Sequence, residues 1–185
     1  MRADFTHGID APPLAFEIRA RQQLTQQSGA EQDHAGDQRQ SAHQHQRTMF
    51  GNDIDAGPEL LDECRKLNGC PTGGAKMTSG HRLRARYVIH AVGPVWQGGA
   101  RRESELLESC YRRALRLAAE HGLKSIAFPC ISTGVYRFPK DRAAKIAVDT
   151  IMAEIQNMPV IEKVLFVCFA EEEYLIYKKL LKHNP

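Results

Sequence analysis

The run Phe128–Pro139 carries the residues best suited to chemistry in this chain. The run begins at the end of the apolar segment Ser125–Pro129 and finishes at Pro139, where a helix is expected to start. Between them lies the loop Cys130-Ile131-Ser132-Thr133-Gly134-Val135-Tyr136. In an open α/β sheet, ligands bind outside the carboxyl ends of the strands. Backbone N–H groups of a loop of small residues can donate to an anion there, and Gly134 allows close approach. The run therefore predicts capture of a phosphate-bearing small molecule, with Tyr136 adding an aromatic face and a hydroxyl.

Other side chains are weaker candidates for chemistry. Cys130 could act as a nucleophile only with a base beside it. The nearest histidine candidate, His90, lies among apolar residues of an expected strand, so a role in the core is favoured. Trp96 follows a Gly-Pro pair and either roofs a pocket or packs in the core.

Metal binding and two nucleotide-binding motifs find little support. His34, His43 and His45 come without Cys or carboxylate ligands at metal-binding spacing, so a polar loop is favoured. No Walker-type loop and no Gly-x-Gly-x-x-Gly fingerprint occurs.

Strand-like and helix-like segments alternate from residue 57 onward, which predicts an α/β fold with helices on both faces of the sheet. The strand Lys163–Phe169 is apolar on both faces and is expected to be central. The expected helices are Pro58–Leu67, Glu103–His121, Pro139–Ile155 and Glu171–Leu181, and the other expected strands are Tyr87–Val92 and Ser125–Pro129.

Composition indicates a soluble protein of one domain. The chain has 185 residues, a net charge of +3 and five scattered cysteines, which are typical of reduced thiols in a cytoplasmic protein. No apolar run reaches the length of a membrane span. The charge is too low to favour nucleic acid, and a solvated face is favoured for the basic cluster of Arg82, Arg84, Arg86, Arg101, Arg102, Arg112, Arg113 and Arg116.

The chain divides near Ala56. Residues 22–47 are rich in Gln, His, Asp, Ser and Ala and nearly free of large apolar side chains. Such a segment buries too little apolar surface to offset its ordering entropy. Residues 1–55 are therefore expected to form an atypical polar segment, poorly ordered in part, and residues 56–185 the folded core.

Residues 57–169 resemble the macro domain family, which binds ADP-ribose, and are similar to its bacterial and MacroD-type O-acetyl-ADP-ribose deacetylases. The resemblance implies a three-layer α/β/α fold with a mixed sheet. The matching segments are Gly57-Pro58-Glu59-Leu60-Leu61, Gly69-Cys70-Pro71-Thr72-Gly73, Tyr87–Trp96, Ile126–Tyr136 and Phe138-Pro139.

The resemblance also implies a binding site that needs no metal and no cofactor. Its ligand loop would comprise Ser132, Thr133, Gly134, Val135 and Tyr136, with Tyr136 the one catalytic candidate. Phe169 would lie near the adenosine, and Asp4 would accept a hydrogen bond from the adenine. The implied partners are ADP-ribose, O-acetyl-ADP-ribose and mono-ADP-ribosylated proteins, without a membrane or a specific nucleic acid.

The first third of the chain departs from the family pattern. It lacks the family's Asn-Ala-Ala-Asn and Val-Asp-Gly segments, which grip the distal ribose and position the attacking water. The amino-terminal strands and the first ligand loop are therefore expected to be missing or replaced. Three functions stay open: an ADP-ribosyl ester hydrolase, an ADP-ribose-binding module without turnover, and a degenerate chain that does neither.

Overall fold

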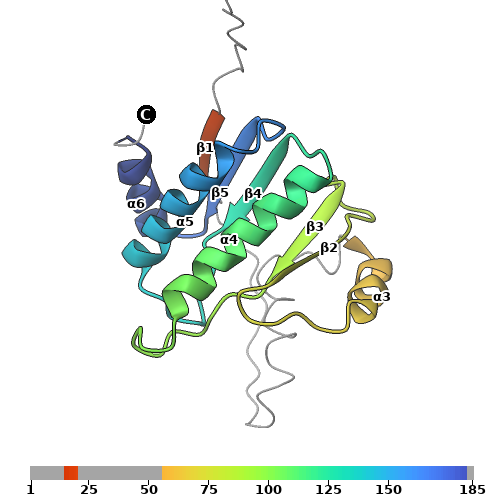
Figure 1. The fold of residues 1–185 in the computed structure, drawn as a ribbon, viewed down its shortest axis with the longest axis horizontal. Coiled ribbons are helices and arrows are strands. Elements are labelled where there is room, and N and C mark those ends of the chain that lie inside the picture. The colour runs from red at the N-terminus through yellow and green to blue at the C-terminus, as the bar shows by residue number, and fades with distance from the viewer. Residues whose placement is uncertain (1–14, 21–55, 183–185) are drawn as a thin grey trace, which may run out of the picture.

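The structure is a computed structural model that describes residues 15–20 and 56–182, and for residues 15–20 it describes the backbone alone. Strands and helices alternate along most of the chain (Figure 1). The elements are β1 (Ala15–Ala20), α3 (Pro58–Lys66), β2 (Ala75–Ser79), β3 (Tyr87–Ala91), α4 (Glu103–Glu120), β4 (Ser125–Pro129), α5 (Lys140–Ile155), β5 (Lys163–Cys168) and α6 (Glu171–Lys182).

The described strands form two sheets. In the first, β1, β5 and β4 lie in that order and all run parallel. In the second, β2 and β3 form an antiparallel pair. The predicted α/β class is confirmed, and β5 is central in the parallel sheet, as its apolar sequence predicted.

Helices α4, α5 and α6 cover one face of the parallel sheet. Tyr111 of α4 packs on Phe128 of β4, with ring centroids 5.1 Å apart. Tyr177 of α6 packs on Phe166 of β5 at 4.6 Å. Phe128 and Phe166 are register partners and so point to the same face. The small buried residues of α5 let it pack closely within this layer: Ala143, Ala144 and Ala147.

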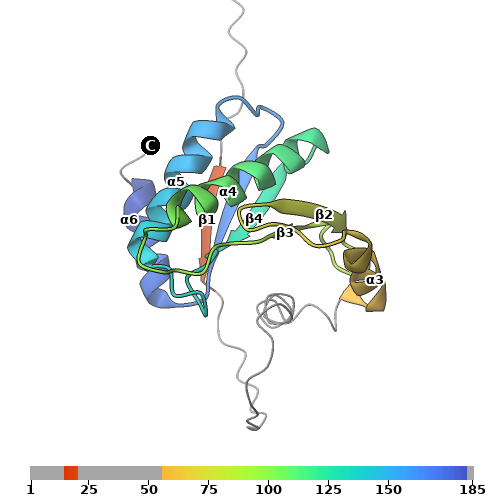
Figure 2. The same ribbon diagram turned by 60° about the horizontal axis from the view of Figure 1, so that its bottom comes forward.

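Helix α3 lies on the opposite face of the β2–β3 pair from α4 (Figure 2). His90 of β3 points to α3, where its Nε2 lies 3.6 Å from Cys64 Sγ. The preceding residue, Ile89, packs against the core cluster that contains Leu107 and Tyr111 of α4. Because successive strand residues point to opposite faces, the β2–β3 pair has helices on both sides, as the α/β fold predicted.

Within the described residues, β3 and β4 each have one unpaired edge, and the two sheets are not joined there. β3 pairs only with β2, and β4 pairs only with β5. No Cα atom of β3 lies within 8 Å of β4, although α4 contacts both strands. Neighbouring strands lie about 4.8 Å apart, so β3 and β4 are not neighbours in a ladder. Instead of the one mixed sheet expected, the described strands therefore form two sheets beneath a shared helix.

The expected helices and strands are all present, with ends that differ by at most one residue. Helix α4 ends as predicted, with Gly122 just beyond it at φ 63°. Sequence analysis missed β1 and β2. The other residues of 1–55 lie outside the described residues, so the predicted boundary near Ala56 stays a prediction.

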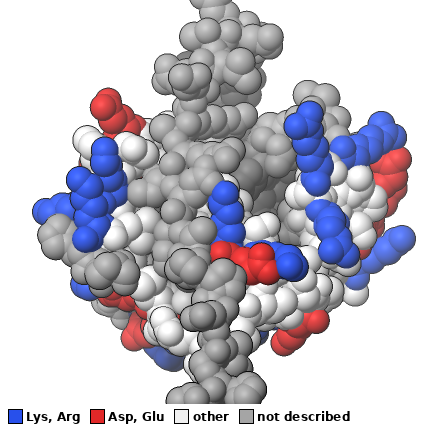
Figure 3. Space-filling view, turned by 90° about the horizontal axis from the view of Figure 1, so that it is seen from above, with Lys and Arg blue, Asp and Glu red and all other residues white. Residues whose placement is uncertain are grey.

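Basic side chains are separated and partly neutralised. Figure 3 shows Lys and Arg at the left, at the right and near the middle of the top face, with Asp and Glu beside some of them. Arg82 lies 2.9 Å from Glu59, and Arg112 pairs with Glu108 and Glu154. Among the described helices, none has the length and apolar composition that a membrane crossing requires.

Candidate ligand-binding site

Three loops come together at the carboxyl ends of β3, β4 and β5. The loop after β3 contacts the loop after β4 through Trp96 N–H, which donates to Tyr136 O at 2.9 Å. The loop after β4 contacts the start of α6 through Thr133 Oγ1, which donates to Glu173 Oε1 at 2.6 Å. These contacts join the three loops at the edge of the sheet where α/β proteins bind ligands.

The loop after β4, residues 130–138, folds partly on itself. Three of its amides donate to carbonyls within the loop: Thr133 to Cys130 at 3.4 Å, Arg137 to Gly134 at 2.9 Å and Phe138 to Ser132 at 3.0 Å. Four further amides of the loop, those of Ser132, Gly134, Val135 and Tyr136, have no acceptor among residues 56–182. The N–H groups of residue 132 and residues 134–136 are thus available to an external anion.

Ser132 holds the tightest position of this loop. Its φ is 68°, and its side chain is buried with a hydroxyl that has no partner among the described residues. The chain after β3 passes directly beside it. A Cβ atom on Gly93 would lie 2.2 Å from Ser132 Oγ, so only glycine fits at position 93 without a shift.

The Thr133 hydroxyl faces the protein interior. It lies 2.6 Å from Glu173 Oε1 and 3.0 Å from Cys130 O. Glu173 is buried, and its other oxygen accepts the amides of Phe169 and Ala170 at 3.3 and 3.4 Å. The Thr133 side chain therefore fixes the loop, while the loop's backbone remains for a ligand.

Large apolar side chains are exposed around this edge. Val95 follows β3 and is 50% exposed, Val135 lies in the loop after β4 and is 56% exposed, and Phe169 follows β5 and is 40% exposed. Of the large apolar side chains described, the other exposed one is Leu175 on α6. Apolar groups beside free amides are suited to a ligand with both rings and phosphates.

Trp96 packs against two neighbouring side chains. Its ring packs on Phe138, with centroids 4.7 Å apart, and the Arg142 guanidinium lies 4.9 Å above it. Of the two roles left open for Trp96, these contacts favour packing. Tyr136 is half-buried, and its described contact is the carbonyl bond from Trp96.

Cys130 and His90 both have structural roles. Cys130 is buried, and a hydrogen bond with the Cys168 thiol, together with burial, raises the pKa of its thiol. A thiol held in this form is a poor nucleophile. His90 Nε2 lies 2.8 Å from Thr78 Oγ1, and burial lowers the pKa of its imidazole. The preference for a core histidine agrees with this geometry.

Sequence analysis missed two buried glutamates that shape the loops. Glu103 accepts the amides of Gln97, Gly99 and Arg101 at 3.0, 3.0 and 2.6 Å. Burial alone would raise the pKa of the Glu103 carboxyl, but these hydrogen bonds hold it below its ordinary value. Glu173 is the third residue of α6, a position from which glutamate commonly caps helix amides, so the capping pattern could have indicated it.

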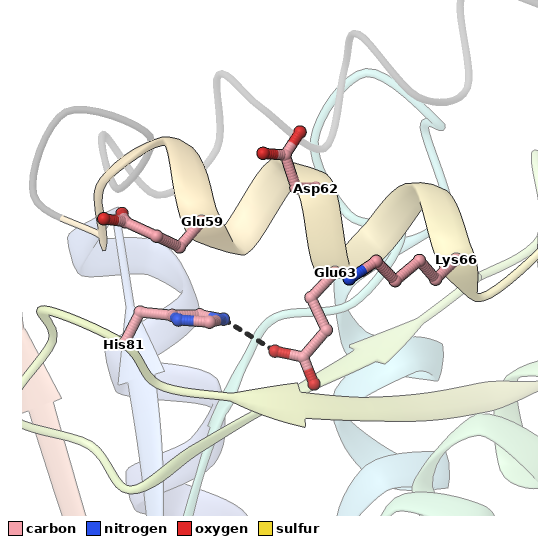
Figure 4. A pocket seen from close by; sticks show the side chains of 5 residues that line it. All are labelled: Glu59, Asp62, Glu63, Lys66 and His81. Carbon is pink, nitrogen blue, oxygen red and sulfur yellow. Dashed lines mark hydrogen bonds and ion pairs between the residues drawn. The ribbon is translucent and has the colours of Figure 1, made fainter.

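A separate surface hollow lies on α3 (Figure 4). It has a volume of about 520 Å³ and is lined by Glu59, Asp62, Glu63, Lys66 and His81. His81 Nε2 lies 2.6 Å from Glu63 Oε2 and closes one side of it. The hollow is open, and all the side chains that line it are ionisable.

Several predicted residues cannot be located. Asp4, His34, His43 and His45 lie outside the described residues. Within the described part of the chain, no three His, Cys, Asp or Glu side chains are grouped as metal ligands.

Comparison with known proteins points to one family. The Macro domain family model matches residues 54–147. A macro domain-containing protein of Methanosarcina mazei is 55% identical over 126 residues, which cover 68% of this chain and 67% of that protein. A protein of Enterobacter cloacae named O-acetyl-ADP-ribose deacetylase is 52% identical over 130 residues, covering 68% and 72%.

Solved structures give the same result. The Oceanobacillus iheyensis macrodomain with ADP aligns with a TM-score of 0.67 and 44% identity, covering 72% of this chain and 74% of that one. The Trypanosoma brucei macrodomain in complex with ADP-ribose aligns with a TM-score of 0.63 and 42% identity, covering 68% and 53%.

Proposed function

The chain belongs to the macro domain family, and from that premise we propose that it binds ADP-ribose at the carboxyl edge of its sheet. The single observation that carries the proposal is the set of free amides at Ser132, Gly134, Val135 and Tyr136. These groups lie in the loop that the family resemblance assigns to the diphosphate.

The chemistry of the loop fits a diphosphate. A hydrogen bond from an amide to a charged acceptor contributes about 1.5–3 kcal/mol. Three such bonds hold a diphosphate without a lysine. The loop also leads into the N-terminus of α5, a helix of 16 residues whose dipole favours negative charge at that end.

The exposed apolar side chains fit the other parts of ADP-ribose. Phe169 and Val135 lie in the segments that follow the adjacent strands β5 and β4, and they offer apolar surface to the adenosine and the proximal ribose. Burial of this surface against the ligand adds to the phosphate bonds and favours the whole ADP-ribose molecule over free diphosphate.

Isothermal titration calorimetry tests this proposal. ADP-ribose, ADP and inorganic diphosphate are titrated separately into the full chain at fixed salt. We expect a one-to-one complex with ADP-ribose that is tighter than the complex with diphosphate. Equal affinity for all three would leave only nonspecific anion binding, and no heat with any of them would reject the proposal.

A second candidate function is hydrolysis of O-acetyl-ADP-ribose or of mono-ADP-ribosyl protein esters. It is favoured by the names of relatives from Enterobacter cloacae and Klebsiella pneumoniae, which are O-acetyl-ADP-ribose deacetylases at 52% and 48% identity. In this hypothesis Tyr136 and the loop amides hold the ribose and diphosphate while water attacks the ester.

Acetate release from O-acetyl-ADP-ribose separates this hydrolase from a binding module. Binding with turnover supports the hydrolase, whereas binding without acetate supports the module. Because the family's Asn and Asp segments are missing, we expect turnover orders of magnitude slower than in a complete relative, even where binding is retained.

A further inference from the structure

Glu173 connects two of the three loops at the carboxyl edge. One carboxylate oxygen accepts the Thr133 hydroxyl from the loop after β4 at 2.6 Å. The other oxygen accepts the Phe169 and Ala170 amides from the loop after β5. Thr133 and Glu173 are 40 residues apart in sequence, so this link is made only by the fold.

The side chain of Glu173 is well satisfied despite its burial. A buried carboxylate is costly unless hydrogen bonds and nearby positive charge compensate it. Here a hydroxyl and two amides bond to its two oxygens, and it lies in the first turn of α6, where the helix dipole favours a negative charge. This bonding makes Glu173 a rigid connector rather than a mobile surface acid.

The two loops that Glu173 connects hold different parts of the proposed ligand. The loop after β4 offers free amides to phosphates, and Phe169 offers an exposed ring. A ligand with both a diphosphate and an adenosine must contact both loops at once. Its affinity therefore depends on the spacing between the loops, whereas the affinity of a diphosphate alone does not.

We propose that Glu173 is a positioning residue that sets the spacing of the two ligand loops through its bonds to Thr133 and to the Phe169 and Ala170 amides. The proposal rests on ADP-ribose binding as the function of the site. Glu173 itself does not contact the ligand, and the Thr133 hydroxyl serves the link rather than the ligand.

Four variants isolate the link. Thr133→Val removes the hydroxyl with little change in shape, and Thr133→Ser keeps a hydroxyl. Glu173→Ala removes both sets of bonds. Glu172→Ala is the matched control, because it removes the neighbouring exposed carboxylate, which pairs with Lys140 and has no bond to Thr133.

The first readout is affinity for ADP-ribose and for inorganic diphosphate by calorimetry. Thr133→Val and Glu173→Ala should each weaken ADP-ribose binding about tenfold, the equivalent of one lost charged hydrogen bond. Both should change diphosphate binding less than about threefold, and Thr133→Ser and Glu172→Ala should resemble the wild type. Equal losses for both ligands would overturn the proposal, since they indicate general damage to the phosphate loop.

The double variant Thr133→Val/Glu173→Ala tests whether the two residues act as one unit. If they do, it binds ADP-ribose no more weakly than Glu173→Ala alone. Additive losses would contradict a shared link.

The second readout needs no ligand and so separates this proposal from ADP-ribose binding itself. In amide hydrogen exchange, Thr133→Val should speed exchange at Phe169 and Ala170, because loosening the Thr133 bond frees Glu173. Unchanged exchange there rejects the link even if ADP-ribose binds. If the wild type binds no ADP-ribose, the proposed function fails while this readout still decides whether Glu173 couples the loops.

Discussion

Ser132 and Gly93 show how single residues position the loop after β4. Ser132 adopts a left-handed conformation with φ 68°, which is costly for a residue with a side chain. Its buried hydroxyl lies where a Cβ of residue 93 would be, so the two positions must be chosen together. The shape of the loop after β4 thus depends on a glycine in the loop after β3.

Gly93→Ala should weaken ADP-ribose binding about tenfold, because the added methyl must displace Ser132 or Ile131 and shift the free amides. Calorimetry measures the effect. Gly80→Ala is the control: it also creates a close contact, with the backbone at Ala85 O, but at the opposite end of the β2–β3 pair. It should lower the melting temperature and leave affinity unchanged, and equal affinity in both variants would contradict the role of Gly93.

Gly134→Glu should abolish ADP-ribose binding, because it puts a bulky negative side chain beside the amides that would hold the diphosphate. Leu175→Glu adds the same charge at an exposed position on α6 and should bind normally. Retained affinity in Gly134→Glu would show that the loop after β4 is not the site.

Among the elements, β5 differs from β3 and β4 in its pairing. β5 has a partner on each edge, whereas β3 and β4 each have one partner among the described strands. Unpaired edge amides exchange readily with solvent. We therefore expect native-state hydrogen exchange to be slowest in β5 and faster in β3 and β4. Equal protection in all three would mean that another segment pairs with the free edges.

The packing of α3 on the β2–β3 pair should depend on pH through His90. Burial lowers the pKa of His90 in the folded chain, while Glu63 nearby opposes this effect, and Thr78 and Cys64 contact the ring. The unfolded chain then binds more protons between the two pKa values. The free energy of unfolding should fall as pH drops below about 6.5, the ordinary histidine value.

Urea unfolding of the wild type and His90→Gln at several pH values tests this prediction. The variant removes the titrating ring, so its stability should vary less between pH 7.5 and pH 5. Parallel curves for the two proteins would show that His90 does not carry this dependence.

Sequence patterns predicted the elements with the longest apolar patterns and missed two short strands. α4 repeats apolar residues at helical spacing, and β5 is almost wholly apolar, so both were expected. β2 reads Ala-Lys-Met-Thr-Ser and β1 reads Ala-Phe-Glu-Ile-Arg-Ala, and each is held in place by a neighbouring strand. Such pairing is a tertiary effect that a short segment does not reveal.

The same reasoning explains which parts of the site could be foreseen. The run Ser132–Tyr136 was predicted because strand, loop and helix follow one another in sequence. Its supports, Gly93 and Glu173, come from separate elements and meet the loop only in the folded chain. The assignments of Ser132, Thr133, Gly134, Val135, Tyr136 and Phe169 to a ligand remain predictions.

At the scale of the whole molecule, the features suited to ligand binding lie at the carboxyl edge of the strands. Helices α4, α5 and α6 bury one face of the parallel sheet, and three loops with exposed apolar side chains meet at one end. The loop after β4 adds four amides that have no acceptor among residues 56–182. The charged hollow on α3 is a separate feature with no connection to these loops. The family, the fold and the loop geometry all favour this edge as the proposed ligand-binding site.

Residue-resolved NMR of the full chain, titrated with ADP-ribose, tests this account most directly. The account predicts saturable shifts at the amides of Ser132, Gly134, Val135 and Tyr136 and at Phe169, with the residues around the α3 hollow unchanged. Saturable shifts confined to Glu59, Glu63 and His81, or no shifts at all, would contradict it.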